Sequence, residues 1–314
     1  MALTIGVDVG GTKVAAGVVD DNGELLAEVR RDTPATGSGA VVDTIVAVIE
    51  ELRLRYAVTA VGVAAPGFVD ETRSVVRIAP NIPGWRDLPL RVEIEKATGL
   101  HAVVENDANA AAWAEVRHGA GRGQSDVICV TVGTGVGGGI VSGGELHRGR
   151  FGNAAEVGHM KVMAEGRPCG CGQRGCWEQY ASGSALVREV RARAAAARFD
   201  AHLLLSLGDG TPEGVSGRHV TEAARGGDPV AIASFEEVGR WLGLGMADLA
   251  AVLDPGCFVV GGGVSEAGEL LLSPARRAYE ENLSGQGFRP VAEIRAARFG
   301  NDAGMIGAAD LARR

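Results

Sequence analysis

Two stretches of the chain, about 125 residues apart, share one pattern of apolar strand, glycine turn and second apolar strand. The first joins Leu3–Val9 to Val14–Val19, and the second joins Asp126–Val132 to Ile140-Val141. No helix is expected directly after either turn, which separates both from P-loop and dinucleotide-binding turns. Backbone N–H groups in a tight glycine turn face an anion. The repeat therefore predicts an α/β protein of two related lobes that close around a nucleotide.

Composition and charge limit the classes of partner. Of the 314 residues, 46% are hydrophobic and 22% are charged, as in globular proteins. The net charge of −8 has no basic stripe, which argues against nucleic acid as the main partner. No apolar run reaches the roughly 20 residues of a membrane helix, and no signal peptide is expected. Cys129 and Cys257 lie in apolar strand-like runs and are interpreted as buried thiols, so a cytoplasmic protein is expected.

A segment rich in cysteine lies between Glu156 and Glu178 and contains the motifs E-V-G-H and C-G-C-G-Q-R-G-C-W-E. Three thiolates and one imidazole fill all four positions of a tetrahedral zinc shell, and a closed shell indicates a structural ion. The predicted ligands are His159, Cys169, Cys171 and Cys176. Because two glutamates flank them, we expect zinc to hold a loop whose carboxylates have a separate task.

Two aspartates follow predicted strands. Asp8 stands at the mouth of the first glycine turn, where it would repel a bare phosphate, so it predicts a Mg²⁺ ion there. An ordinary hairpin with a turn-favouring aspartate is an equal alternative. A strand over His101–Glu105 delivers Asn106 and Asp107 just before the alanine-rich helix Ala110–Val116. A helix N-cap is the simpler interpretation of Asp107 or Asn109, but ligands of open α/β sheets bind at strand carboxyl ends, which favours a general base at Asp107.

The polar candidates suit a ligand with many hydroxyl groups. Carboxylates, an amide and an imidazole offer each hydroxyl a partner, and aromatic residues make up only 4% of the chain, which argues against a stacking pocket. Phosphoryl transfer needs Mg²⁺, donors around the γ-phosphate, and an aspartate that accepts the proton of the attacking hydroxyl. Each of these requirements has a candidate in the sequence.

Five motifs resemble those of the ROK sugar kinases: D-V-G-G-T-K, E-N-D-A-N-A, V-G-T-G-V-G-G-G, E-V-G-H and C-G-C-G-Q-R-G-C-W-E. The similarity extends from residue 3 to about residue 312 and is greatest to the bacterial glucokinases of that family. It implies an actin-like, ribonuclease-H-like α/β fold with a cleft between two lobes. The small lobe is expected over residues 1–107 and 300–314, and the large lobe, with the zinc site, over residues 108–299. The implied reaction is ATP-dependent phosphorylation of glucose at its 6-hydroxyl.

The resemblance also implies roles for individual residues. Asp107 matches the base that takes the proton of the sugar hydroxyl, and Asp8 is kept as a magnesium candidate. The implied sugar ligands are Gly67, Asn106, Asp107, Glu156, His159 and Glu178. The implied ATP-binding residues are Gly10, Gly11, Thr12, Lys13, Gly133, Thr134, Gly135, Val136, Gly137, Gly138, Gly262 and Gly263. For Gly262 and Gly263, a plain strand-to-helix turn is an equally good interpretation. The implied cofactors are structural Zn²⁺ and Mg²⁺ with ATP, and a homodimer or homotetramer is implied.

Several alternatives stay open. Within the enzymes, the acceptor is glucose or another hexose or N-acetylhexosamine, namely mannose, fructose, N-acetylglucosamine or N-acetylmannosamine. Polyphosphate could replace ATP as donor. A sugar-responsive ROK repressor is disfavoured, because Asp8 lies too near the start for a preceding DNA-binding domain and the chain is acidic. An actin- or chaperone-like ATPase is disfavoured because it has no use for the zinc motif and its glutamates. The segment Leu207–Gly217 carries no motif that assigns it a role.

Overall fold

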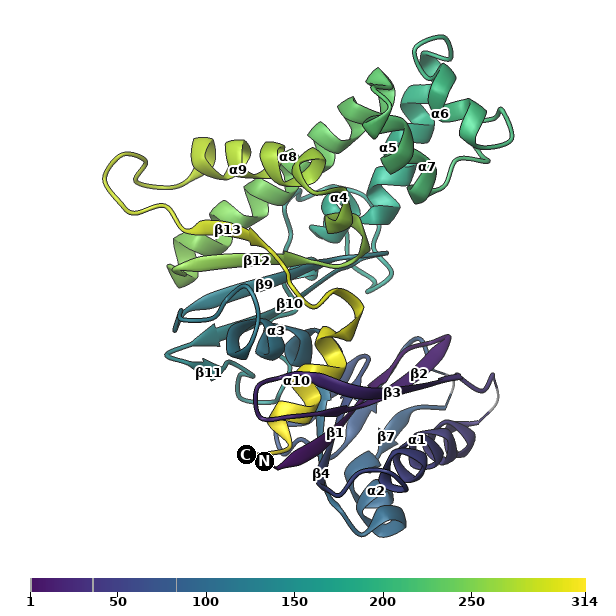
Figure 1. Ribbon diagram of the computed structural model, residues 1–314. Helices are drawn as coiled ribbons and strands as arrows, with labels where there is room; N and C mark the ends of the chain where they lie inside the picture. The colour runs from purple at the N-terminus through teal and green to yellow at the C-terminus, as the bar shows by residue number, and fades with distance from the viewer. Residues whose placement is uncertain (1, 36, 83) are drawn as a thin grey trace. The chain divides into compact units, whose positions relative to one another are not determined.

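The computed structural model describes residues 2–35, 37–82 and 84–314 (Figure 1). The chain forms two compact units. Unit 1 contains Met1–Cys129, Gly138–Ala155 and Ala297–Arg314, and unit 2 contains Val130–Gly137 and Glu156–Ala296. The predicted lobe boundaries after residue 107 and before residue 300 stay a prediction.

Unit 1 is built on a five-stranded mixed sheet in the order β3-β2-β1-β4-β8. Strands β1, β4 and β8 are parallel to one another, and β2 and β3 add antiparallel hairpins at one edge. The strands are β1 (Leu3–Val9), β2 (Lys13–Val19), β3 (Leu25–Asp32), β4 (Val58–Ala65) and β8 (His101–Asn106). The predicted strand–turn–strand at the N-terminus is thus present as β1 and β2.

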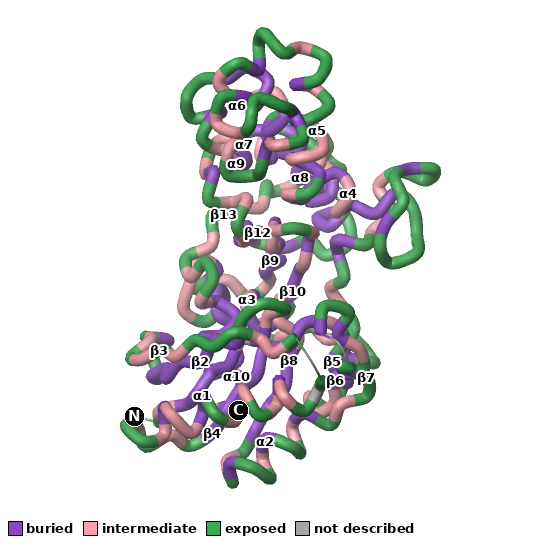
Figure 2. Tube along the Cα trace, turned by 90° about the vertical axis from the view of Figure 1, so that its right-hand side faces the viewer, coloured by how far each residue is buried: buried purple, intermediate pink, exposed green. Residues whose placement is uncertain are grey.

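Helices cover both faces of this sheet (Figure 1). On one face, α1 (Ser38–Arg53) and α2 (Leu90–Thr98) pack their apolar stripes on the alternate residues Ile5, Val7 and Val9 of β1. On the other face lie α10 (Ala303–Leu311) and α3 (Asp107–Arg117). Because successive side chains of a strand point to opposite faces, one strand supplies both cores. Figure 2 shows the central strands of this sheet as buried.

Helix α10 packs unusually close to the sheet because glycines lie beneath it. A Cβ atom added at Gly6 would stand 1.8 Å from the carbonyl oxygen of Met305, and one at Gly62 would stand 1.8 Å from that of Ala308. No side chain fits in that space. The glycines of β1 and β4 therefore set the depth at which the C-terminal helix lies on the sheet.

A small antiparallel sheet follows β4 in unit 1, in the order β5-β6-β7. Its strands are β5 (Phe68–Val69), β6 (Val76–Ile78) and β7 (Arg86–Leu88). The chain enters it through Gly67, which has a φ of 85°. A Cβ atom at Gly67 would stand 2.0 Å from the carbonyl oxygen of Ile78, so only glycine fits this turn.

The second five-stranded sheet has the order β11-β10-β9-β12-β13. Its strands are β9 (Val127–Val132), β10 (Val136–Ser142), β11 (Glu145–Leu146), β12 (Cys257–Gly261) and β13 (Glu293–Ala296). Strands β9 and β10 each contribute residues to both units. The second glycine turn joins two strands with no helix after it, as predicted, and Gly262 lies so close to Val132 that a Cβ atom would stand 2.6 Å from its carbonyl oxygen.

The part of unit 2 outside the sheet is mainly helical. Its longest helix, α8 (Pro229–Leu253), begins at the N-cap Asp228, whose side chain accepts the backbone N–H of Ala231, with proline in the first turn. The other helices are α4 (Glu178–Ala181), α5 (Gly183–Ala196), α6 (His202–Leu207), α7 (Gly217–Arg225) and α9 (Glu269–Asn282). Short 3₁₀ turns are η1 (Val157–His159) and η2 (Gly263–Ala267) in this unit, and η3 (Gly300–Asp302) in unit 1. Among the described residues, none of the helices combines the length and the hydropathy that a membrane span requires.

Candidate active site

Three parallel strands of unit 1 bring candidate residues to one edge of the sheet. Asp8 on β1 pairs with Ala64 on β4, and Ala64 pairs with Glu105 on β8. Asn106 ends β8 and Asp107 begins α3. Because the carboxyl ends of parallel strands meet at one edge, Asp8 and Asp107 come together there, close enough for their charges to interact.

Asn106, and not Asp107, caps helix α3. The Asn106 Oδ1 atom accepts the backbone N–H of Asn109 at 3.0 Å, and its Nδ2 donates to the carbonyl oxygen of Gly67 at 3.0 Å and to Asp107 Oδ1 at 3.1 Å. Asp107 Oδ1 also accepts the N–H of Ala108 at 2.8 Å. The simpler interpretation of Asp107 as the N-cap therefore fails, because its neighbour fills that role.

The two aspartates lie where a charged carboxylate is disfavoured. Burial raises the pKa of Asp107 above its ordinary value. Burial, and next the charge of Asp107, raise the pKa of Asp8 to about 6, while Lys13 acts in the opposite direction. A raised pKa suits Asp107 for accepting a proton near neutral pH. Near a cation such as Mg²⁺, the ionised form of Asp8 is favoured again.

The first glycine turn presents a short exposed segment. The backbone N–H of Gly10 donates to the carbonyl oxygen of Lys13 at 2.9 Å and closes the turn, while Gly11, Thr12 and Lys13 are exposed. Thr33 on the neighbouring segment donates its hydroxyl to the carbonyl oxygen of Gly10 at 2.7 Å and fixes the turn from outside. The structure thus places all four residues in a pinned, accessible turn next to Asp8.

In unit 2, the three sugar-ligand candidates of the zinc segment come together. His159 Nε2 lies 4.0 Å from Glu156 Oε2, and His159 Nδ1 lies 3.9 Å from Glu178 Oε1. Glu178 Oε1 is also 2.9 Å from Cys169 Sγ, and its Oε2 would stand 2.4 Å from a Cβ atom at Gly135. Glu178 therefore lies between the zinc group and the second glycine turn, and any side chain at position 135 would displace it.

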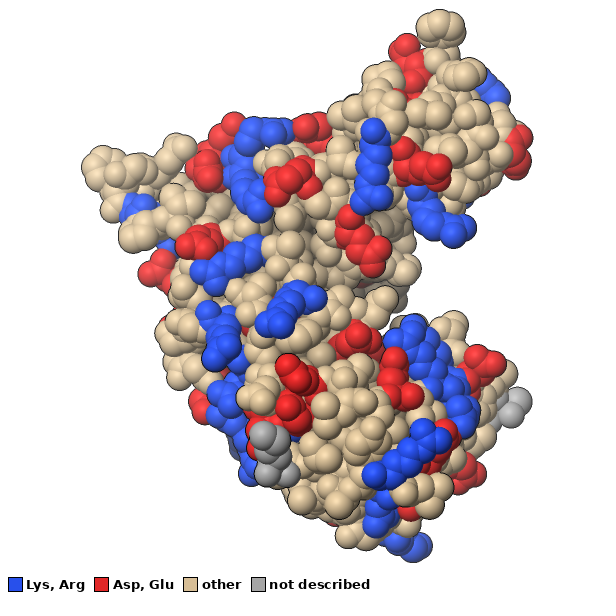
Figure 3. All heavy atoms as spheres, viewed as in Figure 1, with Lys and Arg blue, Asp and Glu red and all other residues tan. Residues whose placement is uncertain are grey.

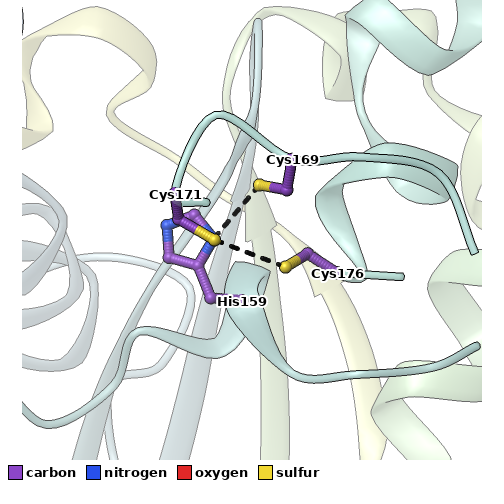
Figure 4. Close-up of side chains that lie close together, drawn as sticks. All are labelled: His159, Cys169, Cys171 and Cys176. Carbon is purple, nitrogen blue, oxygen red and sulfur yellow. Dashed lines mark hydrogen bonds between the residues drawn. The ribbon is translucent and has the colours of Figure 1, made fainter. Parts of the chain in front are cut away.

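The four predicted zinc ligands form a cluster that fits the ion. The ligand atoms of His159, Cys169, Cys171 and Cys176 all lie within 4.8 Å of one another. Figure 4 shows the three sulfur atoms and the imidazole gathered around a common centre. Cys171 Sγ and Cys176 Sγ are 3.6 Å apart, close to the ~3.8 Å expected for two sulfurs that each lie ~2.3 Å from a tetrahedral zinc. Since Nδ1 of His159 lies 3.8 Å from Cys169 Sγ, Nδ1 is the ligand atom that fits, and Nε2 is left facing Glu156.

A cavity of about 1100 Å³ adjoins the second glycine turn within unit 2. The turn contributes Gly133 and Thr134, and η2 contributes Gly263. The backbone N–H of Gly183, at the start of α5, donates to the carbonyl oxygen of Gly133 at 2.7 Å, which ties the turn to this helix. The cavity therefore brings together two of the predicted nucleotide-binding segments, 133–138 and 262–263.

Two helix faces that line this cavity were missed from the sequence. Both faces have side chains at the spacing i, i+3, i+4 and i+7, which places them on one side of a helix. From α5 these are Ser184, Val187, Arg188 and Arg191, and from α7 they are Arg218, Thr221, Glu222 and Arg225. The spacing was visible in the sequence, but it is equally typical of a solvated helix face.

Charged side chains are mixed over the visible surface. On the face that Figure 3 shows, basic and acidic side chains alternate on both units without a continuous basic stripe. This distribution agrees with the net charge of −8.

Comparison with known proteins shows similarity over the whole length. The profile of the ROK family matches residues 4–314. A glucokinase of Streptomyces coelicolor is 54% identical over 313 residues, which cover 100% of this chain and 98% of that protein. A crystal structure of a ROK family glucokinase from Streptomyces griseus, in complex with glucose and AMPPNP, is 55% identical and superposes with a TM-score of 0.89 over 99% of both chains. A ROK hexokinase from Thermus thermophilus is 37% identical, with a TM-score of 0.80 over 99% of this chain and 98% of that one.

Proposed function

The chain belongs to the ROK family, and from this premise we propose that it is a glucokinase that transfers the γ-phosphoryl group of ATP to the 6-hydroxyl of glucose. The observation that carries the proposal is the full-length similarity to the Streptomyces griseus glucokinase that binds glucose and AMPPNP. The fold is the actin-like α/β fold of the ROK sugar kinases.

Asp107 is the proposed general base. It accepts the proton of the 6-hydroxyl while that oxygen attacks the γ-phosphorus, and the bond to the leaving β-phosphate oxygen breaks. Its partly buried position supports this role, because desolvation raises the pKa of Asp107 above its ordinary value. Gly67, Asn106, Glu156, His159 and Glu178 bind the sugar hydroxyls, each through a carbonyl, amide, carboxylate or imidazole group.

The donor nucleotide is proposed to bind in the cavity of unit 2. The glycine turn at Gly133–Gly138 holds phosphates through backbone N–H groups, and Gly262 and Gly263 allow close approach of the nucleoside. Arg188, Arg191 and Arg218 at the cavity wall add positive charge toward a polyanion. The turn at Gly10–Lys13 of unit 1 is the other proposed phosphate-binding segment.

Two metal ions belong to the proposed function. Asp8 is proposed to hold the Mg²⁺ that accompanies ATP, an ion that would offset the charge developing on the phosphates. His159, Cys169, Cys171 and Cys176 would hold zinc with all four positions filled by protein, so the ion would shape the loop that carries Glu156 and Glu178 and take no part in the reaction.

A panel of acceptors and donors tests the function. The purified protein is supplied with Mg-ATP or polyphosphate and with glucose, mannose, fructose, N-acetylglucosamine or N-acetylmannosamine, and the phosphorylated position is identified by NMR. We expect glucose 6-phosphate from ATP, with kcat/KM for glucose at least about tenfold above every other sugar, since a site built for hydroxyls rejects altered ones strongly. A preference for an N-acetylhexosamine or for polyphosphate would replace the proposed substrate.

The pH dependence of the reaction follows from the pKa of Asp107. The base works only when ionised, and burial raises its pKa, so activity falls as the pH drops through a value above the ordinary aspartate range near 4. We expect kcat/KM for glucose to fall about tenfold per pH unit on the acid side. Initial rates after return to pH 7.5 control for acid denaturation. A rate that stays level down to pH 4 would contradict the role of Asp107.

We further propose that the protein acts in the cytoplasm as a homodimer or homotetramer. Zinc thiolates need the reduced sulfur that the cytoplasm maintains. On unit 2, Phe288 is 96% exposed, and Val252 and Val291 are 81% and 52% exposed, which supports contact with another copy. Analytical ultracentrifugation tests the assembly, and a single monomer peak at micromolar concentration would contradict it.

A further inference from the structure

Glu105 is a buried carboxylate whose two oxygens face different parts of unit 1. Its side chain, at the end of β8, is 1% exposed. Oε2 lies 2.9 Å from Arg73 Nε and 2.8 Å from Arg148 Nε. Oε1 accepts the backbone N–H of Asn106 at 2.9 Å and the Nδ2 of Asn109 at 3.2 Å. One carboxylate therefore joins two guanidinium groups to the two asparagines around Asp107.

Arg73 lies in the loop between β5 and β6, and Arg148 lies in the loop after β11. Both arginines hold the β5–β6 loop in place. Arg148 donates through NH1 to the carbonyl oxygen of Glu71 at 3.0 Å and through NH2 to that of Asp70 at 2.9 Å. The carbonyl oxygen of Arg73 accepts the backbone N–H of Val104 on β8 at 3.0 Å. The segment that begins at Gly67 is thus fastened to the end of β8, with Glu105 as the shared partner.

The same end of β8 carries the groups proposed to meet the sugar. Asn106 reaches back to the carbonyl oxygen of Gly67 and forward to Asp107, as described above. We propose that Glu105 is a positioning residue, which with Arg73 and Arg148 fixes the relative placement of Gly67, Asn106 and Asp107. This inference rests on the proposed function. Small displacements of groups that orient a reacting hydroxyl lower turnover strongly, so the effect reaches catalysis although Glu105 touches no substrate.

Glu105→Gln tests the inference, with Glu115→Gln as a matched control. Glu115 is 3% exposed and lies on α3, where it accepts the backbone N–H groups of Ala120, Arg298 and Phe299. Both substitutions remove one buried, hydrogen-bonded carboxylate from unit 1, but only Glu105 adjoins the proposed sugar ligands. Melting temperature and active-site titration give the stability and the folded fraction of each variant.

We expect kcat/KM for glucose to fall at least about tenfold in Glu105→Gln per folded molecule, with KM for ATP changed less than about twofold. Glu115→Gln is expected to keep both constants near wild type although it also loses stability. In an Asp107→Asn background, Glu105→Gln is expected to add little to the loss of kcat, since residues that act as a unit are not additive, and still to weaken glucose binding in calorimetry.

Arg73→Met keeps the inference testable if Glu105→Gln does not fold, because the Arg73 side chain is 29% exposed and easier to replace. We expect kcat/KM for glucose to fall about three- to fivefold with little change in KM for ATP, since one of the two ion pairs of Glu105 remains. Equal losses of kcat/KM for glucose and for ATP, or a Glu105→Gln variant that behaves as Glu115→Gln does, would overturn the positioning role of Glu105. The proposed function would stand in both cases. A wild-type protein that phosphorylates no sugar would overturn the proposed function, and this inference with it.

Discussion

Replacing Asp107 with asparagine is expected to lower kcat about 10³-fold, the range in which a positioned general base contributes. The amide keeps the size of the side chain and one acceptor oxygen, but its NH₂ group donates and cannot take the proton of the 6-hydroxyl. Glucose affinity, measured by calorimetry, is expected to change less than about threefold, because the other sugar contacts remain. Retention of more than about a tenth of wild-type turnover would remove Asp107 from the role of base.

The melting temperature of Asp107→Asn provides a second, independent test. Burial raises the pKa of Asp107 in the folded state above that of the unfolded chain, so the ionised carboxylate destabilises the fold once the pH exceeds the ordinary aspartate pKa. Asp107→Asn is therefore expected to melt at a higher temperature than wild type at pH 8. The difference is expected to shrink toward zero near pH 4. A variant less stable than wild type at pH 8 would contradict the burial argument.

Removal of a zinc ligand is expected to have the second large effect. Cys171→Ala breaks the closed Cys₃His shell, and structural zinc sites contribute most of the folding free energy of the loops they hold. Zinc content is expected to fall from one ion per chain to nearly none, and glucose affinity to fall at least about 100-fold, because Glu178 lies 2.9 Å from Cys169 Sγ and loses its support.

Cys257→Ala is the matched control for the zinc variant. Cys257 is a fully buried cysteine of unit 2, on β12 and outside the ligand cluster. Its truncation leaves a small cavity and is expected to cost about 1 kcal/mol of stability, with zinc content and glucose affinity unchanged. Loss of zinc from Cys171→Ala without loss of glucose affinity would mean that the metal does not shape the sugar site.

Much of the secondary structure could be predicted from sequence, because apolar periodicity and capping residues are local signals. The pattern Pro229–Leu253 predicts α8 with its observed bounds, since proline at the start fits the first turn and Asp228 caps it. Strands β1, β9 and β12 are apolar runs that end in glycine. The pattern missed β3, whose residues alternate between exposed and half-buried over most of its length, and the short helix α6 (His202–Leu207).

The candidate site, like the secondary structure, could be predicted from the sequence only in part. The Cys₃His spacing predicts the zinc cluster because zinc is bound by few residue types, and in this chain all four ligands lie in one short segment. By contrast, the sequence did not decide whether Asp107 is a general base or the N-cap of α3, and the structure assigns the cap to Asn106. The cavity wall formed by α5 and α7 was missed because an arginine stripe on one helix does not reveal what that helix faces.

The sequence by itself determined the family, the motifs and the chemical types of the groups proposed to meet substrates, because these depend on which residues are present and on short spacings. Only the tertiary structure decided which groups support them. Glu105 lies 32 residues after Arg73 and 43 residues before Arg148 in the chain, and the three side chains meet because parallel strands end at one edge and two loops return to it. Charge pairs of that kind follow from the path of the chain in space, and no local pattern encodes them.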